Sequence, residues 1–481
     1  MKVVSSSQMR LIESRDINEG RYSPQDYAVL VAQALQNIIL QDGARDVLIL
    51  CGDNANGSYG FMLAYLLLKN SHIAPRIIYH GASDNTFYQL AVQNGLQVID
   101  NPRAMKEVVE QSRYVVDCLF GSELDEMISY PDNYIINWVN ENDNYVLSCD
   151  LPSGLDGNDG SLYGCCIRAD KTMTIELPKI GLYLKPGCEY AGEIICQPVG
   201  LSYDAIGSIS SNIETLEDRQ LKEQVLKMDS HTSVLLFAGS GLSTSGYLLT
   251  CQSLLASGCD SVTLAGDRLS YDMTGSRLYE VERILLDDDN LGGDLKQIDY
   301  SRYDLIVYWG GFDRGQLIVE KLMESGRPLL FTPSGAGDLR PQAQLLERRA
   351  ATALMLDQNG YEDFFGPISP SSFLDDAVGS CRKYGDLKIL YRSANSLAID
   401  SQGVSIGRNS DVLDHKAGLT DVLTGCCGAL LAQKNDRMSL CCANEICYRA
   451  AENYTRDHYK YAISAQQLTE QLNRQLYELS K

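Results

Sequence analysis

The chain has 481 residues, of which 44% are hydrophobic and 22% are charged, as in an ordinary globular protein. At roughly 150 residues per domain, this length favours two or three domains. Its 63 acidic residues outnumber 41 basic ones, which gives a formal net charge of −22. Nucleic acids and anionic membranes attract clustered Lys and Arg, so we expect neither as a partner. A nucleotide cofactor needs only a local site and stays compatible with this charge.

The cysteines and the N-terminal segment indicate the compartment. The 15 cysteines are odd in number and form no pair of CxxC motifs, which argues against a structural zinc site. The opening residues MKVVSSSQMRLIESRD are polar and lack the apolar core of a signal peptide. No uncharged apolar run approaches the roughly 20 residues that span a bilayer. We therefore expect a cytoplasmic protein with reduced, mostly buried thiols.

The first half of the chain alternates between helical and extended patterns. Residues 28–40 predict a helix, residues 46–52 (DVLILCG) a buried strand, and residues 61–70 (FMLAYLLLKN) the following helix. Further strand-like runs follow, each leaving room for a helix: RIIYHG (76–81), LQVID (96–100), YVVDCLFG (114–121) and YVLSCDLPSG (145–154). This alternation is typical of βαβ units and predicts an α/β fold with a mostly parallel sheet.

A polar segment over residues 203–230 interrupts this rhythm. We place the domain joint within about ten residues of residue 222, which gives domains of residues 1–222 and 223–481. A second α/β rhythm begins at SVLLFAGSG (233–241), and residues 420–434 (TDVLTGCCGALLAQK) predict a helix with a small-residue face. Composition and rhythm thus predict two α/β domains in tandem, and say nothing more specific.

Polar clusters follow three of the strands predicted in the first half. Residues 53–60 (DNANGSYG) come after the first of them, Asp117 ends another, and residues 150–157 (DLPSGLDG) follow a third. Ligands bind at the carboxyl ends of strands in open α/β sheets, where Gly and Asn let the backbone approach closely. Each Asp taken singly is also explained by helix capping or a turn. Three clusters at one sheet edge favour a binding site.

The motifs resemble those of known families. VVDCLFG, CDLPSGLDG, the Pro-Lys-x-Gly-Leu of 178–182 and YAGEI occur in the order and spacing of the NAD(P)H-hydrate epimerases, and the opening SSSQMRLIESRDI resembles that family's first helix. The second half resembles the ADP-dependent NAD(P)H-hydrate dehydratases, and the tandem order is similar to that of the bifunctional nicotinamide-nucleotide repair enzymes. This resemblance implies an N-terminal Rossmann-like three-layer domain followed by a C-terminal ribokinase-like domain.

The resemblance implies a site in the first half. In the epimerases a loop of pattern N-N-G-G-D-G matches residues 55–60, so Tyr59 stands where the family has Asp. The matched positions imply a potassium ion held by Asn56, Asp117 and Ser153, with Asp150 as the acid–base group. The same resemblance implies that nicotinamide-nucleotide or ADP contacts come from Asn56, Gly57, Gly60, Gly121, Gly239, Asn395 and Thr420. Glu123 replaces a residue of the phosphate-side turn and would repel a phosphate.

The second half departs further from its family. The nucleotide-binding run K-G-x-x-T matches residues 391–395 (YRSAN), so its Lys and Gly are lost. G-G-T-G-D matches residues 417–421 (AGLTD), where Ala417 and Thr420 replace the glycines that form the anion hole. The turn G-P-G-L-G becomes residues 308–312 (YWGGF). The catalytic Asp matches Asp421, which is also explained as a helix cap. We expect weak or no binding of ADP or ATP.

Two hypotheses follow. In the first, the chain is a nicotinamide-nucleotide repair enzyme whose N-terminal half converts R to S NAD(P)H hydrate, while ADP-dependent dehydration of the S form by the C-terminal half is impaired. In the second, it is a binding or scaffold protein that keeps both folds without turnover. The retained residues favour the first hypothesis for the N-terminal half, and the losses favour the second for the C-terminal half. The family analogy also suggests self-association.

Overall fold

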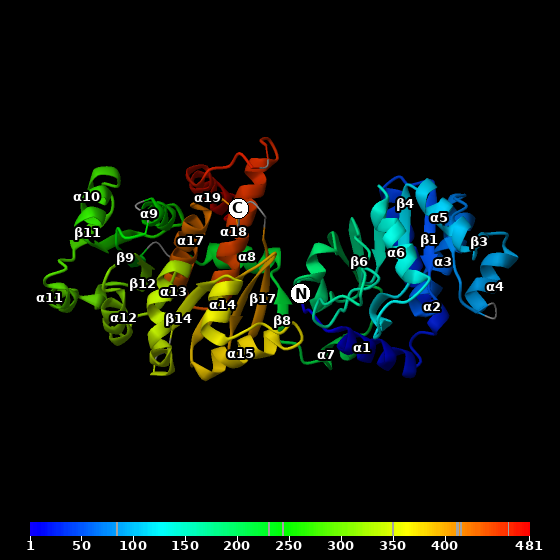
Figure 1. Cartoon of the computed structure of the whole chain (residues 1–481), viewed down its shortest axis with the longest axis horizontal. Helices are drawn as coiled ribbons and strands as arrows, with labels where there is room; N and C mark the ends of the chain where they lie inside the picture. Colours follow the sequence, from blue (N-terminus) through cyan, green and yellow to red (C-terminus); the bar gives the residue numbers. More distant parts are fainter. Residues whose placement is uncertain are drawn as a thin grey trace. The chain divides into compact units, whose positions relative to one another are not determined.

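The computed structural model describes residues 1–82, 85–228, 231–242, 245–348, 351–409, 413, 416–459 and 461–481. The chain divides into two compact units, one of residues 2–211 and one of residues 212–481 together with Met1. Each unit is an α/β structure built on its own sheet (Figure 1). The predicted tandem of α/β domains is therefore confirmed. Among the described residues, no helix is long and apolar enough to cross a membrane.

Within the described residues, the N-terminal unit is built on a seven-stranded sheet of order β3-β2-β1-β4-β5-β6-β7, in which all neighbours are parallel. Its strands are β1 (Val47–Cys51), β2 (Arg76–Ile78), β3 (Gln97–Ile99), β4 (Tyr114–Cys118), β5 (Tyr145–Cys149), β6 (Lys171–Ile175) and β7 (Glu193–Gln197). Its helices are α1 (Ser6–Asn18), α2 (Pro24–Gln41), α3 (Ala55–Ser71), α4 (Thr86–Gln93), α5 (Pro102–Gln111), α6 (Asp132–Glu141) and α7 (Tyr203–Gly207), with short 3-10 turns η1 (Gly121–Glu123), η2 (Ile180–Leu182) and η3 (Gly187–Glu189).

Strand β1 shows why this unit has three layers. Val47 and Ile49 pack into the core formed with α1, α2 and α3, whereas Leu48 and Leu50 pack into the core formed with α5 and α6. All residues of β1 are buried. A strand covered on both faces needs a continuous apolar run rather than an alternating one, and the run VLILC is of this kind. This pattern confirms the buried parallel strand predicted for residues 46–52.

The C-terminal unit carries, within the described residues, a ten-stranded sheet of order β11-β10-β9-β12-β13-β14-β15-β16-β17-β8. Its strands are β8 (Ile213–Thr215), β9 (Ser233–Ala238), β10 (Ser261–Gly266), β11 (Glu282–Leu285), β12 (Leu305–Gly310), β13 (Leu329–Phe331), β14 (Thr352–Leu356), β15 (Leu387–Arg392), β16 (Asn395–Asp400) and β17 (Gly403–Arg408). The pairs β15–β16 and β16–β17 are antiparallel and the remaining neighbours are parallel.

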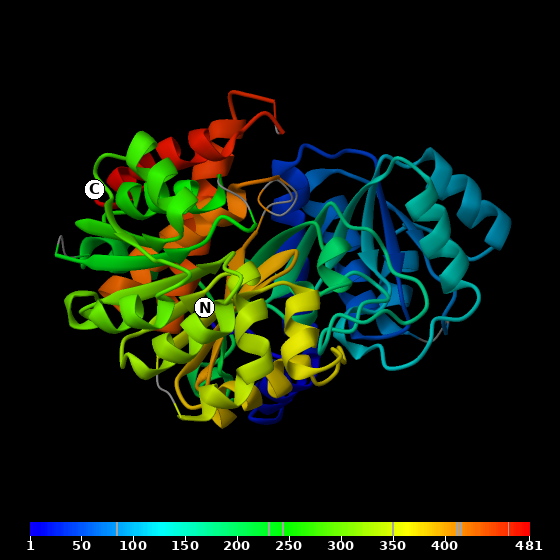
Figure 2. The ribbon, with the colours of Figure 1, turned by 60° about the vertical axis from the view of Figure 1, so that its left-hand side comes forward.

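Helices cover both faces of this sheet. Its helices are α8 (Asp218–Leu226), α9 (Gly246–Ala256), α10 (Arg268–Arg277), α11 (Leu291–Gln297), α12 (Gly315–Glu324), α13 (Pro333–Leu339), α14 (Gln358–Phe365), α15 (Phe373–Lys383), α17 (Leu419–Gln433), α18 (Arg437–Thr455) and α19 (Ala465–Leu479), with 3-10 turns η4 (Tyr300–Arg302) and η5 (Arg340–Arg348). Helices α9, α17, α18 and α19 share one core with alternate residues of the central strands. Helices α13 to α15, coloured yellow-green to yellow, lie on the other side of the strands (Figure 2).

The units divide after Ser211, at the edge of the expected ten-residue margin, whereas residue 222 itself falls inside α8. Strand β8 pairs in parallel with β17, with Ile213 opposite Val404. Helix α8 buries Leu221 and Val225 in the core of the C-terminal unit. Both elements therefore belong to the second unit, and the chain changes units after Ser211. Because this segment is mostly polar, its composition did not indicate the three-residue strand β8 or the narrow apolar face of α8.

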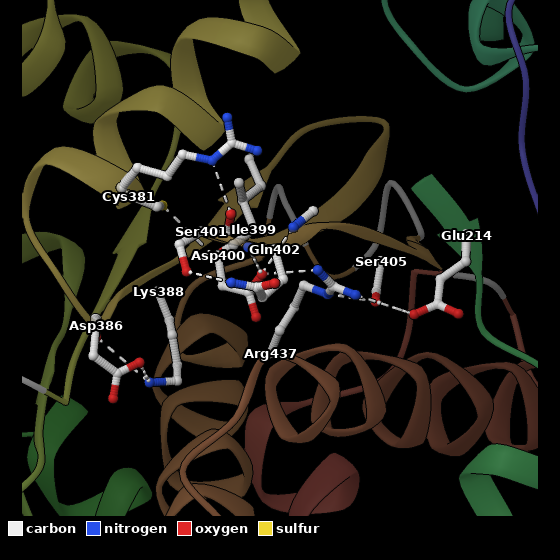
Figure 3. Close-up of polar contacts among 12 residues, drawn as sticks. Glu214, Cys381, Asp386, Lys388, Ile399, Asp400, Ser401, Gln402, Ser405 and Arg437 are labelled. Carbon is white, nitrogen blue, oxygen red and sulfur yellow. Dashed lines mark hydrogen bonds and ion pairs between the residues drawn. The ribbon is translucent and has the colours of Figure 1, made fainter. Parts of the chain in front are cut away.

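Arg437, at the start of α18, ties β8 to the C-terminal sheet (Figure 3). Its guanidinium donates to Ser405 Oγ at 2.9 Å, to Asp400 Oδ1 at 2.8 Å and to Glu214 Oε1 at 3.2 Å. The Arg437 side chain is 16% exposed, so this network is screened less by solvent than a surface ion pair. A single side chain thus joins β8, β17 and the end of β16.

Replacing this cation tests the assignment of β8 to the second unit. We expect Arg437→Gln to lower the free energy of opening of residues 213–215 by about 2 kcal/mol, because Glu214 and Asp400 lose a charge-assisted partner. Amide hydrogen exchange followed by mass spectrometry measures this change. Arg219→Gln is the matched control, since Arg219 is 84% exposed and its i,i+4 pair contributes about 0.5 kcal/mol or less. Equal protection of β8 in both variants would contradict the role of Arg437.

Candidate functional site

Asp117 lies at the end of β4 and is fully buried. Its carboxylate accepts hydrogen bonds from Ser153 N (2.8 Å), Ser153 Oγ (2.6 Å), Ser148 Oγ (2.8 Å) and Leu119 N (3.2 Å). Burial raises the pKa of Asp117, and these hydrogen bonds oppose the rise. The carboxylate therefore fixes Ser153 and the loop after β5 against the end of β4.

Asn56, in the first turn of α3, lies beside the same strand ends. Helix α3 is capped by Asn54, whose side chain accepts from Gly57 N at 2.9 Å. The buried Asn56 amide donates through Nδ2 to Cys149 O at 3.3 Å, while its Oδ1 has no hydrogen-bond partner among the described residues. Gly121 has φ +61°, and a Cβ there would lie 3.2 Å from Asn56 Oδ1. The fold thus holds an unsatisfied amide oxygen close to the Gly121 turn.

The two remaining glycines expected to contact ligand in this loop have packing roles. A Cβ at Gly57 would lie 1.8 Å from Gly52 O, and one at Gly60 would lie 2.7 Å from Cys51 Sγ. Both glycines let α3 approach β1, which brings Asn56 to the sheet edge. Their presence is therefore required by helix–strand packing before any ligand is considered.

Asp150 follows β5 and takes a backbone conformation with φ +68°, which Asp and Asn adopt more readily than other non-Gly residues. Its carboxylate forms an ion pair with the buried Lys179 ammonium and accepts from Ile175 N at 3.2 Å. Lys179 also donates to Ile175 O at 3.0 Å and to Thr174 Oγ1 at 3.3 Å. All three donors of the buried Lys179 ammonium are thus used, and the ion pair fixes the position of the Asp150 carboxylate after β5.

Glu13, on α1, is a titratable group that our sequence interpretation did not single out. Tyr27 OH donates to Glu13 Oε1 at 3.0 Å. Burial, and then the charge of Asp150, raise the pKa of Glu13 to about 7, whereas Lys179 and the Tyr27 hydrogen bond oppose the rise. In the sequence Glu13 looks like any acidic residue of an amphipathic helix, so only the packing of α1 distinguishes it.

Tyr59 and Glu123 border this group of residues. The Tyr59 ring lies 6.0 Å from that of Tyr27, and burial raises the pKa of the Tyr59 phenol well above its ordinary value. Glu123 Oε2 accepts from Ala55 N at 3.3 Å, at the N-terminus of α3. Tyr59 therefore places a neutral phenol where the family's loop has Asp. The Glu123 carboxylate accepts a hydrogen bond from a backbone amide at the start of α3.

In the second unit, Gly239 directly follows β9, and it contacts the turn that follows β12. Gly239 N donates to Gly310 O at 2.9 Å, and a Cβ at Gly239 would lie 2.2 Å from Gly311 O. Gly310 and Gly311 have φ of +96° and +87°. The two turns thus meet backbone to backbone, and this contact by itself requires glycine at 239.

Asp421 lies in the first turn of α17, but the helix cap is Gly418, which contradicts the capping alternative. Its Oδ1 accepts from Trp309 Nε1 at 2.9 Å, and a Cβ at Gly246 would lie 3.0 Å from Oδ2. Burial raises the pKa of Asp421, while the Trp309 hydrogen bond lowers it. Trp309 is 4% exposed. The carboxylate is therefore partnered by the indole of Trp309, which stands at the Pro position of the family's turn.

Arg392 and Thr420 meet at the N-terminus of α17. Arg392 Nη1 donates to Thr420 Oγ1 at 2.7 Å, and its Nη2 donates to Leu413 O at 3.1 Å. Tyr391, at the position of the family's Lys, packs 4.8 Å from the ring of Phe373. Asn395 begins β16 opposite Arg408 of β17. The guanidinium is thus bonded to Thr420, which stands where the resemblance places a glycine of the family's anion hole.

Comparison with known proteins agrees with these two units. Residues 25–181 match the model of the YjeF-related protein N-terminus, and residues 234–474 match that of NAD(P)H-hydrate dehydratase. The chain is 25% identical over 479 residues to a bifunctional NAD(P)H-hydrate repair enzyme Nnr of Dictyoglomus turgidum, with 90% of each chain covered. It is 28% identical over 209 residues to an NAD(P)H-hydrate epimerase of Leuconostoc citreum, covering 42% of this chain and 91% of that protein.

Comparison with solved structures gives matches over part of the chain. The ADP/ATP-dependent NAD(P)H-hydrate dehydratase of Bacillus subtilis, co-crystallised with ATP and Mg²⁺, has a TM-score of 0.47 at 15% identity and covers 56% of this chain and 100% of that one. The two family models match one half of the sequence each, and the Dictyoglomus turgidum relative aligns with 90% of the chain. The chain belongs to the family of the bifunctional NAD(P)H-hydrate repair enzymes, with an epimerase-type domain followed by a dehydratase-type domain.

Proposed function

We propose that the N-terminal unit epimerises the R form of NAD(P)H hydrate to the S form, with Asp150 as an acid–base group. The observation that carries this proposal is the buried Asp150–Lys179 pair at the carboxyl end of β5, beside Ser153 and Asn56. The proposal is also supported by relatives named NAD(P)H-hydrate epimerase that align with this half. Inversion at the hydrated ring carbon needs proton transfer at the ring oxygen or nitrogen, and a desolvated carboxylate with a fixed partner suits that role.

A potassium ion fits the donors beside Asp150. Asn56 Oδ1, Asp117 and Ser153 Oγ would hold it, since one carboxylate and neutral oxygens suit a hard, weakly charged cation. The unsatisfied Asn56 Oδ1 supports this assignment, because buried amide oxygens without a partner are rare. Such an ion would supply positive charge that keeps Asp117 ionised and orders the loops after β4 and β5.

For the C-terminal unit we propose impaired, or lost, ADP-dependent dehydration. Arg392 bonded to Thr420 fills the N-terminus of α17, and Trp309 partners the carboxylate of Asp421. Both contacts compete with a nucleotide phosphate and with substrate at the positions that the family uses. These contacts also favour a second candidate role for this half, as a folded scaffold without turnover.

The first test replaces Asp150 by Asn, which tolerates the same positive φ and keeps the shape of the side chain. We expect Asp150→Asn to lower the rate of R-to-S conversion at least about 100-fold, because the carboxylate that moves the proton is lost. Chromatography of a mixed R,S NADHX preparation, corrected for spontaneous epimerisation, measures this rate. Asp143→Asn, an exposed position before β5, should leave it unchanged. Retained activity in Asp150→Asn would contradict the proposed role.

The second test concerns the cation. We expect potassium, compared with choline at equal ionic strength, to raise the unfolding temperature of the full chain. A cation at a hundredfold excess over its Kd stabilises the native state by about 2.7 kcal/mol. Differential scanning calorimetry measures the shift, and Asn56→Ala should abolish it because Oδ1 is removed. A shift of the same size in sodium, or one that persists in Asn56→Ala, would argue against a potassium site at these residues.

The third test concerns the nucleotide. We expect isothermal titration of the wild type with ADP and Mg²⁺ to show no saturable binding. The double variant Arg392→Gly with Thr420→Gly should gain binding, because it reopens the amides at the start of α17. Nucleotide-dependent NADH formation from the S hydrate by the wild type would show that this half is an active dehydratase.

A further inference from the structure

Arg10, on α1, is an exposed cation at the edge of the proposed epimerase site. Its Nη1 donates to Ser122 O, in the turn η1 that follows β4, and its Nη2 donates to Ser7 Oγ at 3.4 Å. Gly121 precedes Ser122 in that turn, and a Cβ at Gly121 would lie 3.2 Å from Asn56 Oδ1. The guanidinium is therefore bonded to the residue next to the one that faces Asn56.

Several contacts fix the start of α1 against the loops of the site. Val4 N donates to Pro178 O at 3.0 Å, and Ile180 N donates to Val4 O at 2.9 Å. A Cβ at Gly157 would lie 2.1 Å from Ser6 Oγ, so the first turn of α1 packs closely on the loop after β5. The backbone that carries the guanidinium is thus held by residues far away in the sequence.

The Arg10 guanidinium has donors that remain available to a ligand. Arginine carries five N–H donors and no acceptor, and the two contacts above both end on neutral oxygens. Arg15, on the same helix, forms an ion pair with Glu19 at 3.0 Å, whereas Arg10 forms none with any carboxylate of the described residues. A guanidinium without a carboxylate partner suits phosphate, which it binds through two parallel hydrogen bonds.

Backbone amides that could otherwise bind an anion at this edge are already bonded to side chains of the chain itself. The donors are the amides of Ala55, Gly57, Leu119 and Phe120, and the acceptors are the side chains of Glu123, Asn54, Asp117 and Ser153. The N-terminus of a helix is otherwise a favourable place for a phosphate. At α3 that place holds the Glu123 carboxylate, so an anionic ligand has to find its donors elsewhere.

The dinucleotide substrate of the proposed function carries a diphosphate, and carboxylates surround the site. Asp117, Asp150 and Glu123 lie at this edge of the sheet. The Lys179 ammonium is buried and all its donors are used. A negatively charged ligand that approaches these groups needs a compensating cation that solvent can reach. Arg10 meets this requirement.

We propose that Arg10 binds the diphosphate of the dinucleotide, while its hydrogen bond to Ser122 O fixes the direction of the guanidinium. This role rests on the proposed epimerase function and deepens it by naming what holds the nucleotide part of the substrate. Glu123 acts against the same diphosphate, because its carboxylate lies in the turn that Arg10 contacts. Arg10 moves no proton, so its loss changes substrate binding and leaves the chemical step intact.

The test measures kcat and KM of the full chain for R-to-S conversion, corrected for spontaneous epimerisation. With the hydrate of NADH, we expect Arg10→Gln to raise KM about 10-fold or more and to keep kcat within about 2-fold, because a charged hydrogen bond is lost in ground and transition states alike. Arg10→Lys should recover part of the affinity, since it keeps the charge without the planar fork. Glu123→Gln should lower KM, because a repulsive charge is removed.

A substrate without phosphate separates this role from a structural one. The hydrate of reduced nicotinamide riboside carries the same ring without a diphosphate, so Arg10→Gln and the wild type should convert it with equal kcat/KM. Arg15→Gln is the matched control, since it removes one positive charge from the same helix. Because Arg15 is paired with Glu19, this variant should leave KM for the NADH hydrate unchanged.

The outcomes separate the two claims. An active wild type whose KM for the NADH hydrate is unchanged in Arg10→Gln overturns the role of Arg10 and leaves the proposed function in place. A loss confined to kcat, or an equal loss on both substrates, would show that Arg10 serves the turn rather than the diphosphate and would also overturn its role. A folded wild type that converts neither hydrate overturns the proposed function and the role of Arg10 with it.

Discussion

The buried carboxylate of Asp117 is the interaction on which the N-terminal site depends. Burying an ionised carboxylate is costly unless hydrogen bonds replace its lost water. Here the replacements come from Ser153, Ser148 and the backbone after β4. Each donor belongs to a strand or loop at the same sheet edge, so satisfying one charge also fixes the loops of two neighbouring strands. Asp150 owes its position to the same loop.

Polar side chains at the motif positions of the two units are partnered differently. In the N-terminal unit, Asn56 Oδ1 is buried without a partner among the described residues, which is costly in a finished fold. In the C-terminal unit, Asp421 is partnered by Trp309 and Thr420 by Arg392. Where the chain satisfies its own polar groups, a ligand must displace them, and binding is weakened by that cost. The motif positions of the two halves therefore differ: the first keeps a polar atom without a partner among the described residues, and the second has its polar side chains bonded to one another.

Substitutions within these motifs work through packing as well as through direct contact. Tyr59 replaces a loop Asp and packs on Tyr27, whose hydroxyl in turn holds Glu13. Trp309 stands at the Pro of the family's turn and donates a hydrogen bond to Asp421. Each replacement introduces a ring with one polar atom, which both fills space and donates a hydrogen bond. Tyr59 and Trp309 count as losses when motifs are compared, yet each one makes new contacts at its site.

The sequence by itself determined the α/β class, the places of the main strands along the chain and the positions of Asp117, Asp150 and Ser153 at one sheet edge. It did so because apolar runs, turn residues and motif spacing are local properties of the chain, and parallel strands bring their carboxyl ends to one edge. The change of units after Ser211, the ion pair of Asp150 with Lys179, the environment of Glu13 and the contacts of Trp309 and Arg392 emerged only from the tertiary structure. These features join residues far apart in sequence. Burial and the charges that surround a side chain are set by packing, which no local pattern records.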